Sequence, residues 1–381
     1  MTNSQADDLA RPEVAITGVG VASAFGRGPG PVLDGVLAGQ PAFGPVTRFS
    51  AGRCRVRTDA ELPGSPLLAA ELEAVIDDAC ATAGLSPADR AAAVLLLALH
   101  SDGAAARDPS AATVVGDTAA VVAARCGLPP PARIYATACT AGSSAIADAG
   151  AMITSGRAAL VIVAAGFLVD ADSLALFDAG RTLARDGQVR PFSAGRRGLL
   201  LGDGVAAVVL EPAPAARRRG VPELARLAGW GRAGDAYHVC QPHPDGAGLA
   251  RAIGAALGRA QVGPAQIGYI NANGTGTVSS DSSEAAALHR ALGSYADAIP
   301  VSSTKSLHGH ALEASALLEL VITVLAVRAG FLPVNAGYLA PDAECELDLV
   351  LGTAREGRPR YALSLNAAFG GACTALVVAA A

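Results

Sequence analysis

Short apolar runs alternate with longer segments of mixed polarity along most of the chain. We assign the runs to buried strands because they are rich in aliphatic residues and are bounded by glycine, proline or polar residues. The predicted strands span residues 14–23, 93–99, 134–136, 158–166, 205–210, 267–272, 299–304, 361–365 and 374–379. Because nearly all of them are apolar throughout, the pattern predicts an α/β protein whose sheets are covered on both faces.

Helices are predicted between these strands. They lie within residues 63–83, 114–126, 141–151, 281–292 and 311–328, whereas residues 305–310 are predicted to form a loop. The best candidate for a linker is segment 213–220, which contains Pro214 and three consecutive arginines. We therefore expect two halves, residues 1–212 and residues 213–381. Each half carries a polar loop after a buried strand, where α/β folds usually bind ligands.

Composition and charge exclude several classes of partner. The net charge of −5 argues against nucleic acid as the main partner, because phosphate-binding proteins usually carry a basic excess. The first eight residues are polar and acidic, unlike a signal peptide. The longest uncharged apolar stretch, residues 158–169, is shorter than the ~18 residues that a membrane span needs. We therefore expect a cytoplasmic protein that binds neither nucleic acid nor membrane.

The seven cysteines form no regular pattern. Their number is odd and no C-x-x-C pair occurs, so neither a disulfide framework nor a zinc cluster is indicated. The sequence His238-x-Cys240-x-x-His243 has metal-ligand residue types, but prolines flank it and no fourth ligand is evident. We interpret it as a loop and expect no metal.

Cys139 is the candidate nucleophile. It follows a short predicted strand and precedes a predicted helix of alanine, glycine and serine, so it lies at the first turn of that helix. Unpaired N–H groups and the helix dipole at this position would stabilise a thiolate, the reactive form of cysteine. A single cysteine among alanines is also compatible with an inert core residue. The polar loops of the second half favour a nucleophile, because they would bring Asn273, Lys305 and His310 opposite Cys139.

Several motifs in order along nearly the whole chain resemble the β-ketoacyl synthases, the condensing enzymes of fatty acid and polyketide assembly. They are residues 14–20, 137–139, 190–192, 234–238, 271–277, 302–306, 309–310 and 366–371. The resemblance implies the thiolase fold, with two pseudo-repeated halves in a layered αβαβα arrangement. It also implies an acyltransferase with no tightly bound cofactor, whose substrates arrive as phosphopantetheine thioesters on an acyl carrier protein.

The family's catalytic residues can be assigned from these motifs. Cys139 matches the cysteine that takes the acyl group, and His310 matches one of two histidines that stabilise the enolate formed when a malonyl thioester is decarboxylated. Lys305 matches the lysine that supports the histidine region and the malonyl carboxylate. Glu319 matches a buried acid on the following helix, where a structural salt bridge is the alternative interpretation.

The same resemblance assigns residues that bind the substrate. Thr275 and Thr277 match positions that hydrogen-bond pantetheine, with an ordinary turn as the alternative. Phe369, next to Gly370, matches an aromatic gate whose backbone N–H forms an oxyanion hole with that of Cys139. The family members pair, so we expect either a homodimer or a heterodimer with another ketosynthase-like subunit.

The chain departs from the family at one position of the active site. Asn273 stands where the family has its first histidine. An asparagine amide can donate a hydrogen bond but cannot exchange a proton near neutral pH. Three functions therefore stay open: condensation with an altered donor, acyl transfer or cyclisation without chain extension, and a non-catalytic subunit of a ketosynthase heterodimer. The retained Cys139 argues against the third.

Overall fold

The computed structural model describes residues 13–99 and 113–381. Within these residues its main sheet has eleven strands. Ten of them form two sets of five that share one topology, and the eleventh, β2 (Gly26–Arg27), pairs with β1. The N-terminal set runs in the order β6 (Arg133–Tyr135), β5 (Val94–Leu99), β7 (Val161–Phe167), β8 (Gly204–Pro212) and β1 (Val14–Ser23). The C-terminal set runs in the order β11 (Val301–Ser302), β10 (Ile267–Asn271), β14 (Tyr361–Ala367), β15 (Ala372–Ala379) and β9 (Ala225–Gly234).

The two sets repeat the same pairing pattern. In each set the first three strands are parallel to one another. The fourth strand pairs antiparallel with the third, and the fifth pairs antiparallel with the fourth. The innermost strands, β1 and β9, pair with each other over three residues and make one continuous sheet. This repetition confirms the pseudo-repeated halves that the sequence predicts, while the boundary at residue 213 stays a prediction.

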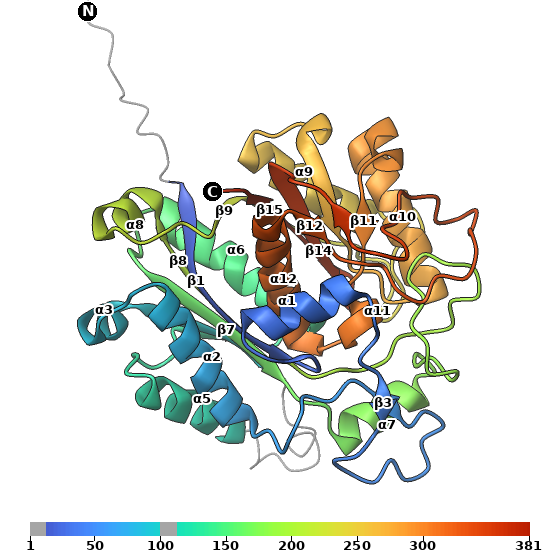
Figure 1. The fold of residues 1–381 in the computed structure, drawn as a ribbon, viewed down its shortest axis with the longest axis horizontal. Coiled ribbons are helices and arrows are strands. Elements are labelled where there is room, and N and C mark those ends of the chain that lie inside the picture. The colour runs from blue at the N-terminus through green and yellow to red at the C-terminus, as the bar shows by residue number, and fades with distance from the viewer. Residues whose placement is uncertain (1–12, 100–112) are drawn as a thin grey trace, which may run out of the picture.

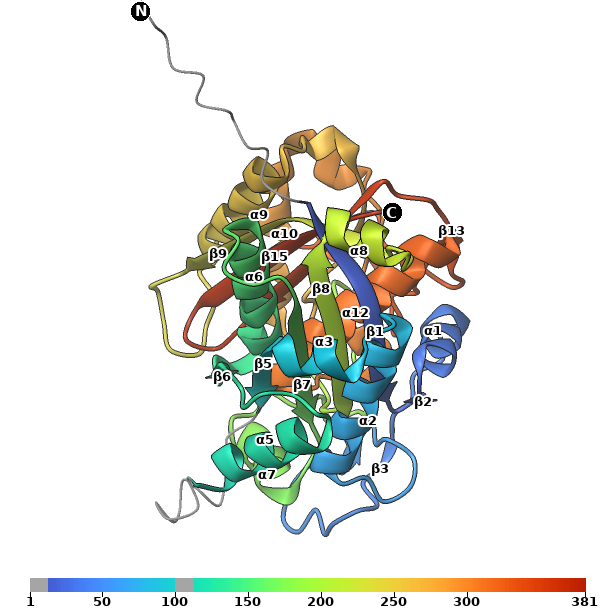
Figure 2. The same ribbon diagram turned by 90° about the vertical axis from the view of Figure 1, so that its left-hand side faces the viewer.

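Helices cover both faces of each half. On the outside, α2 (Leu68–Thr82) and α5 (Thr113–Arg125) lie by the N-terminal half, and α9 (Ala247–Ala260) and α10 (Val278–Leu292) lie by the C-terminal half (Figures 1 and 2). Between the halves, α6 (Ala141–Thr154) packs against α12 (Ser315–Ala329). The order of layers is therefore αβαβα, as the resemblance implies.

Strand β8 shows why the strands are apolar throughout. Its residues Val205, Ala207 and Val209 belong to the core beneath α2, whereas Ala206, Val208 and Leu210 belong to the core around α6 and α12. Successive side chains of a strand point to opposite faces of the sheet, so a sheet between two helical layers must be apolar at every position.

Four predicted segments differ in the structure. The strand predicted over residues 299–304 is reduced to the two residues of β11. The predicted linker forms a short helix, α8 (Ala213–Arg219), because Ala213 and Ala216 pack against Ala15. Part of the predicted loop 305–310 forms α11 (Lys305–His308). The helix predicted over 311–328 begins only at Ser315, after a 3₁₀ turn, η5 (Leu312–Ala314).

The remaining elements were not predicted or are short. They are β2 (Gly26–Arg27), α1 (Pro29–Ala38), β3 (Gly44–Pro45), β4 (Thr58–Asp59), α3 (Pro87–Ala92), α7 (Ala171–Ala179), η3 (Pro264–Gln266), η4 (Gly293–Asp297), β12 (Phe331–Leu332) and β13 (Arg355–Glu356). Within residues 13–99 and 113–381, no helix has the length and apolar character needed to cross a membrane. Among those residues, no three potential metal ligands come together.

Candidate active site

Cys139 lies in a tight turn between the two halves. Strand β6 ends at Tyr135, and a 3₁₀ turn, η2 (Ala138–Thr140), leads directly into α6. Ala138 has a φ of 47°, a left-handed conformation that non-glycine residues adopt rarely. The first turn of α6 also needs small residues: a Cβ on Gly142 would lie 3.0 Å from the backbone nitrogen of Leu317 on α12. This close packing leaves Cys139 only 7% exposed.

The environment of Cys139 favours the thiol over the thiolate. Burial and the carboxylate of Glu313 raise its pKa to about 12, although Lys305 and the cysteine's own backbone N–H act to lower it. The sequence predicts a thiolate stabilised by the helix N-terminus, but here desolvation outweighs that effect. The free protein therefore holds Cys139 protonated at neutral pH.

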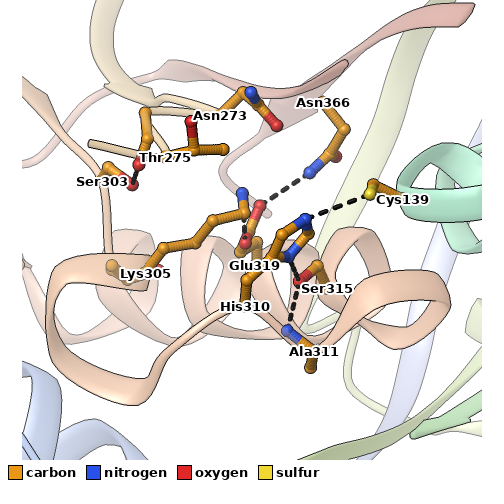
Figure 3. Close-up of polar contacts among 12 residues, drawn as sticks. Cys139, Asn273, Thr275, Ser303, Lys305, His310, Ala311, Ser315, Glu319 and Asn366 are labelled. Atoms are coloured by element: carbon orange, nitrogen blue, oxygen red, sulfur yellow. Dashed lines mark hydrogen bonds and ion pairs between the residues drawn. The ribbon is translucent and has the colours of Figure 1, made fainter. Parts of the chain in front are cut away.

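His310 reaches Cys139 from the C-terminal half. Its Nε2 lies 3.1 Å from the Cys139 Sγ (Figure 3). The segment just before strand β8 holds the backbone of His310. The N–H of His310 donates to the carbonyl of Leu200 (2.8 Å), and its carbonyl accepts from the N–H of Gly202 (3.1 Å). Burial lowers the pKa of His310 well below its usual value, and the charge of Lys305 lowers it further. The imidazole is therefore neutral.

Lys305 belongs to a buried ion pair beside these two residues. Its Nζ lies 2.6 Å from Oε1 of Glu319, and both side chains are at most 1% exposed. The other carboxylate oxygen of Glu319 accepts from Nδ2 of Asn366 at 2.7 Å. Figure 3 shows this network next to His310, without a hydrogen bond to Cys139. The structure thus contains the salt bridge that was the alternative interpretation of Glu319, and its catalytic role stays a prediction.

Asn273 lies two residues after the end of β10, and the backbone N–H of a neighbouring strand orients its side-chain amide. The N–H groups of Asn273 and Gly274 each donate to a carboxylate oxygen of Glu284 at 2.7 Å. The Oδ1 of Asn273 accepts from the N–H of Ala367 at 3.1 Å. Since a backbone N–H can only donate, Nδ2 is the free end of the amide, and it donates to no acceptor in the part of the chain that the structure describes. Asn273 also lines a small cavity of about 20 Å³.

The loop after Asn273 is held by an internal carboxylate. The N–H groups of Thr275 and Gly276 donate to Asp281, and the hydroxyl groups of Thr275 and Thr277 lie 3.0 Å apart. Burial raises the pKa of Asp281 to about 7, although these donors oppose the change. The two threonines therefore lie together on a fixed loop, and their contact with pantetheine stays a prediction.

The predicted gate lies at the surface near this loop. The Phe369 ring is 46% exposed and stacks on the ring of Phe177 with centroids 6.1 Å apart. Gly370 has a φ of 84° and donates its N–H to the carbonyl of Val239 at 2.8 Å. The N–H of Phe369 has no acceptor among the described residues, so it is available as the donor that an oxyanion hole requires.

Comparisons with known proteins identify the family. The "Beta-ketoacyl synthase, N-terminal domain" model matches residues 80–216, and the "Beta-ketoacyl synthase, C-terminal domain" model matches residues 224–338. The chain belongs to the β-ketoacyl synthase family. The tetracenomycin polyketide synthase ketoacyl synthase alpha subunit of Streptomyces glaucescens is 34% identical to this ketosynthase homologue over 415 residues, covering 97% of each chain.

Solved ketosynthases share the whole fold. The ishigamide ketosynthase/chain length factor superposes with a TM-score of 0.89 at 29% identity, covering 98% of this chain and 100% of the other. A type II polyketide synthase ketosynthase, solved with its acyl-carrier protein and a hexaketide, has a TM-score of 0.89 at 25% identity, covering 97% and 100%. The chain therefore has the thiolase-like fold of the ketosynthases.

Two residues at the site were missed by sequence reasoning. Ser315 contacts His310, and Glu313 lies close enough to Cys139 to raise its pKa. Both follow His310 within five positions, so a residue-by-residue examination of this short segment could have singled them out. Their orientation depends on the η5 turn, which no pattern in the sequence predicted.

Proposed function

We propose that this chain is an active ketosynthase that extends an acyl group by decarboxylative condensation in polyketide or fatty acid synthesis. The observation that carries the proposal is the 3.1 Å contact between the Cys139 Sγ and Nε2 of His310, which joins the two halves. A chain that only supported a catalytic partner would not need a cysteine and a neutral imidazole in contact at this position.

In the loading step Cys139 attacks a carrier-bound acyl thioester. A bond forms between Sγ and the acyl carbonyl carbon, the bond from that carbon to the pantetheine sulfur breaks, and the cysteine's proton leaves with the pantetheine thiol. The N–H groups of Cys139 and Phe369 would stabilise the oxyanion that forms between these events. Because Cys139 is protonated in the free protein, its proton must pass to the departing pantetheine sulfur during this step.

In the condensing step a malonyl thioester loses its carboxylate. The C–C bond to the carboxylate breaks and releases CO₂, and its electron pair forms an enolate that attacks the acyl carbon on Cys139. The cysteine sulfur leaves as a thiolate and takes up one proton from the solvent. His310 and the Nδ2 of Asn273 would donate hydrogen bonds to the enolate oxygen, and Lys305 would favour the anionic malonyl group nearby.

The relatives suggest the partners. One similar ketosynthase was solved with its acyl-carrier protein, and another structure is a ketosynthase/chain length factor. We therefore propose that an acyl carrier protein delivers both substrates on phosphopantetheine, with Thr275, Thr277 and Gly370 along the arm. We also propose a dimer, formed either with a second copy or with a ketosynthase-like subunit.

A reconstitution with acyl- and malonyl-carrier proteins tests the proposal. We expect the intact mass of the protein to increase by one acyl group, and the product on the carrier to be longer by two carbons. A Cys139→Ala variant is the control and should remain unacylated. Acylation of Cys139 followed by transfer without extension would support the acyltransferase or cyclase alternative. Failure of every acyl carrier to label Cys139, alone or with a co-purified subunit, would support the non-catalytic alternative.

A further inference from the structure

Ser315 is the buried first residue of α12 and contacts the ring of His310 on the side away from Cys139. Its Oγ lies 2.7 Å from Nδ1 of His310 and accepts the backbone N–H of Ala311 at 2.8 Å. The side chains of Ser315 and His310 are both at most 2% exposed. Figure 3 shows the resulting chain of contacts from Ala311 through Ser315 and His310 to Cys139.

The hydrogens in this chain can be assigned by counting donors. The N–H of Ala311 can only donate, so Oγ of Ser315 is an acceptor there and has one hydrogen of its own. If that hydrogen goes to Nδ1, the ring hydrogen lies on Nε2, facing Cys139, and among these groups only the S–H of Cys139, a weak donor, lacks an acceptor in the described residues. If Nδ1 carried the ring hydrogen instead, Nε2 could accept the weak S–H donor, but the stronger donor, the Ser315 hydroxyl, would have no acceptor within the described residues, which costs more.

We propose that Ser315 is a positioning residue that holds His310 in the Nε2–H tautomer, so that the ring donates a hydrogen bond first to the cysteine sulfur and then to the substrate oxygen. The second part of this role rests on the proposed function. The first part concerns the free protein alone. The neutral state of His310 is consistent with it, because an imidazolium would make both nitrogens donors whatever Ser315 did.

The proposal explains how one histidine and Asn273 can together stabilise the enolate. The Nδ2 of Asn273 is a donor because Ala367 occupies its Oδ1. With the ring hydrogen on Nε2, His310 is also a donor, so the two residues that face the reacting atoms both stabilise negative charge. Neither is a proton acceptor toward Cys139 in the resting state, which agrees with a cysteine that stays protonated until substrate arrives.

The tautomer can be measured directly by NMR of the full chain labelled with ¹⁵N-histidine. Protonated and unprotonated ring nitrogens have well-separated chemical shifts, and a His310→Gln variant identifies the signals of His310. We expect Nε2 to be protonated and Nδ1 to be an acceptor in the native protein. In Ser315→Ala we expect the protonated signal to shift toward Nδ1. We also expect alkylation of Cys139 by iodoacetamide to slow about tenfold, because the thiolate loses a hydrogen-bond donor.

Ser306→Ala is the matched control. Ser306 is likewise buried, accepts the N–H of Ala336 at 2.9 Å and donates to the carbonyl of Ser303 at 2.7 Å, but it has no hydrogen bond to His310. This variant should keep the native tautomer. Ser315→Thr, which retains the hydroxyl, should also keep it, and it provides a second variant if Ser315→Ala does not fold.

Two results would overturn the proposal: a native His310 protonated at Nδ1, or a folded Ser315→Ala variant that keeps the proton on Nε2. Both the NMR measurement and the alkylation rate are obtained without substrate. The protein could show an Nε2–H tautomer that depends on Ser315 and yet release no CO₂ from malonyl-carrier protein. That result would support the role of Ser315 and contradict only the proposed function.

Discussion

At the residue scale, the site combines a neutral imidazole, a buried thiol and an amide in place of a second imidazole. The sequence predicted that Cys139 and His310 lie together, because both stand in motifs whose order and residue types are specific. The sequence did not predict the roles of Ser315 and Glu313, because nothing in it indicates the η5 turn. That turn brings Ser315 to His310 and places the charge of Glu313 close enough to raise the pKa of Cys139. The sequence showed that Asn273 replaces the family's first histidine. Only the structure, through the hydrogen bond from Ala367 to Oδ1, shows that Nδ2 is the end of the amide that is free to donate.

Asn273→Asp tests that donor with almost no change of shape. The carboxylate can still accept the N–H of Ala367, but it replaces Nδ2 by an acceptor next to the developing enolate. We expect CO₂ release to fall by at least about 10²-fold, in line with the loss of one such donor, while acylation of Cys139 persists. Rates of CO₂ release and of acylation should be measured separately, and equal losses in both would contradict a role specific to the enolate.

Glu313→Gln tests the electrostatics of the nucleophile. The Glu313 carboxylate raises the pKa of Cys139, so removing its charge should lower that pKa and increase the thiolate fraction at any pH below it. We expect iodoacetamide to alkylate Cys139 severalfold faster at mildly alkaline pH. The rate should be followed against pH, with Glu344→Gln as a control at an exposed carboxylate. An unchanged pH profile in Glu313→Gln would show that the Glu313 charge does not affect the pKa of Cys139.

At the element scale, long apolar strands were predicted well and short local elements were not. The strands β1, β5 and β10 lie where the sequence places them, because burial on both faces leaves a strong apolar signal. Helices α8 and α11 have seven and four residues, too few for an apolar periodicity, and they form because the surrounding structure packs against them. The strand β9 and helix α9 were missed, since glycine and alanine dominate both.

The ion pair between α11 and α12 should hold these two elements together. Lys305→Met would leave the carboxylate of Glu319 buried without its cation, at a cost of about 3–5 kcal/mol in the free energy of unfolding. The double variant Lys305→Met/Glu319→Leu removes both charges and should recover most of that loss. Chemical denaturation of the three proteins would measure this coupling. A single variant as stable as the native protein would mean that the pair contributes nothing.

At the scale of the whole molecule, two sets of strands with one topology meet at β1 and β9, and the site lies where their central helices pack. The sequence predicted the two halves and the opposition of Cys139 to His310. It could not predict which polar groups would be paired inside this large core. Asp59 is an example, since it is 1% exposed and neither carboxylate oxygen has a partner within the described ranges.

Asp59 should make the stability of the protein depend on pH. Burial raises its pKa to about 7, and the charges of Glu61 and Asp203 act in the same direction. Between about pH 4 and pH 7 the folded state keeps a proton that the unfolded chain releases, so stability falls as the pH rises through this window. Asp59→Asn should abolish that loss and raise the melting temperature at pH 8 more than at pH 4. Asp34→Asn, at an exposed carboxylate, should change neither. Equal effects of Asp59→Asn at both pH values would contradict the assignment.

The central claim is that an acyl group on Cys139 is joined to a malonyl unit in this site. A single turnover tests it most directly: purified acyl-enzyme is mixed with malonyl-carrier protein labelled at the free carboxylate, and both CO₂ and the carrier-bound product are measured. We predict one labelled CO₂ for each acyl group that leaves Cys139, with the acyl chain recovered on the carrier and longer by two carbons. An acyl group that stays on Cys139, or leaves without extension while the label remains in malonate, would contradict the account.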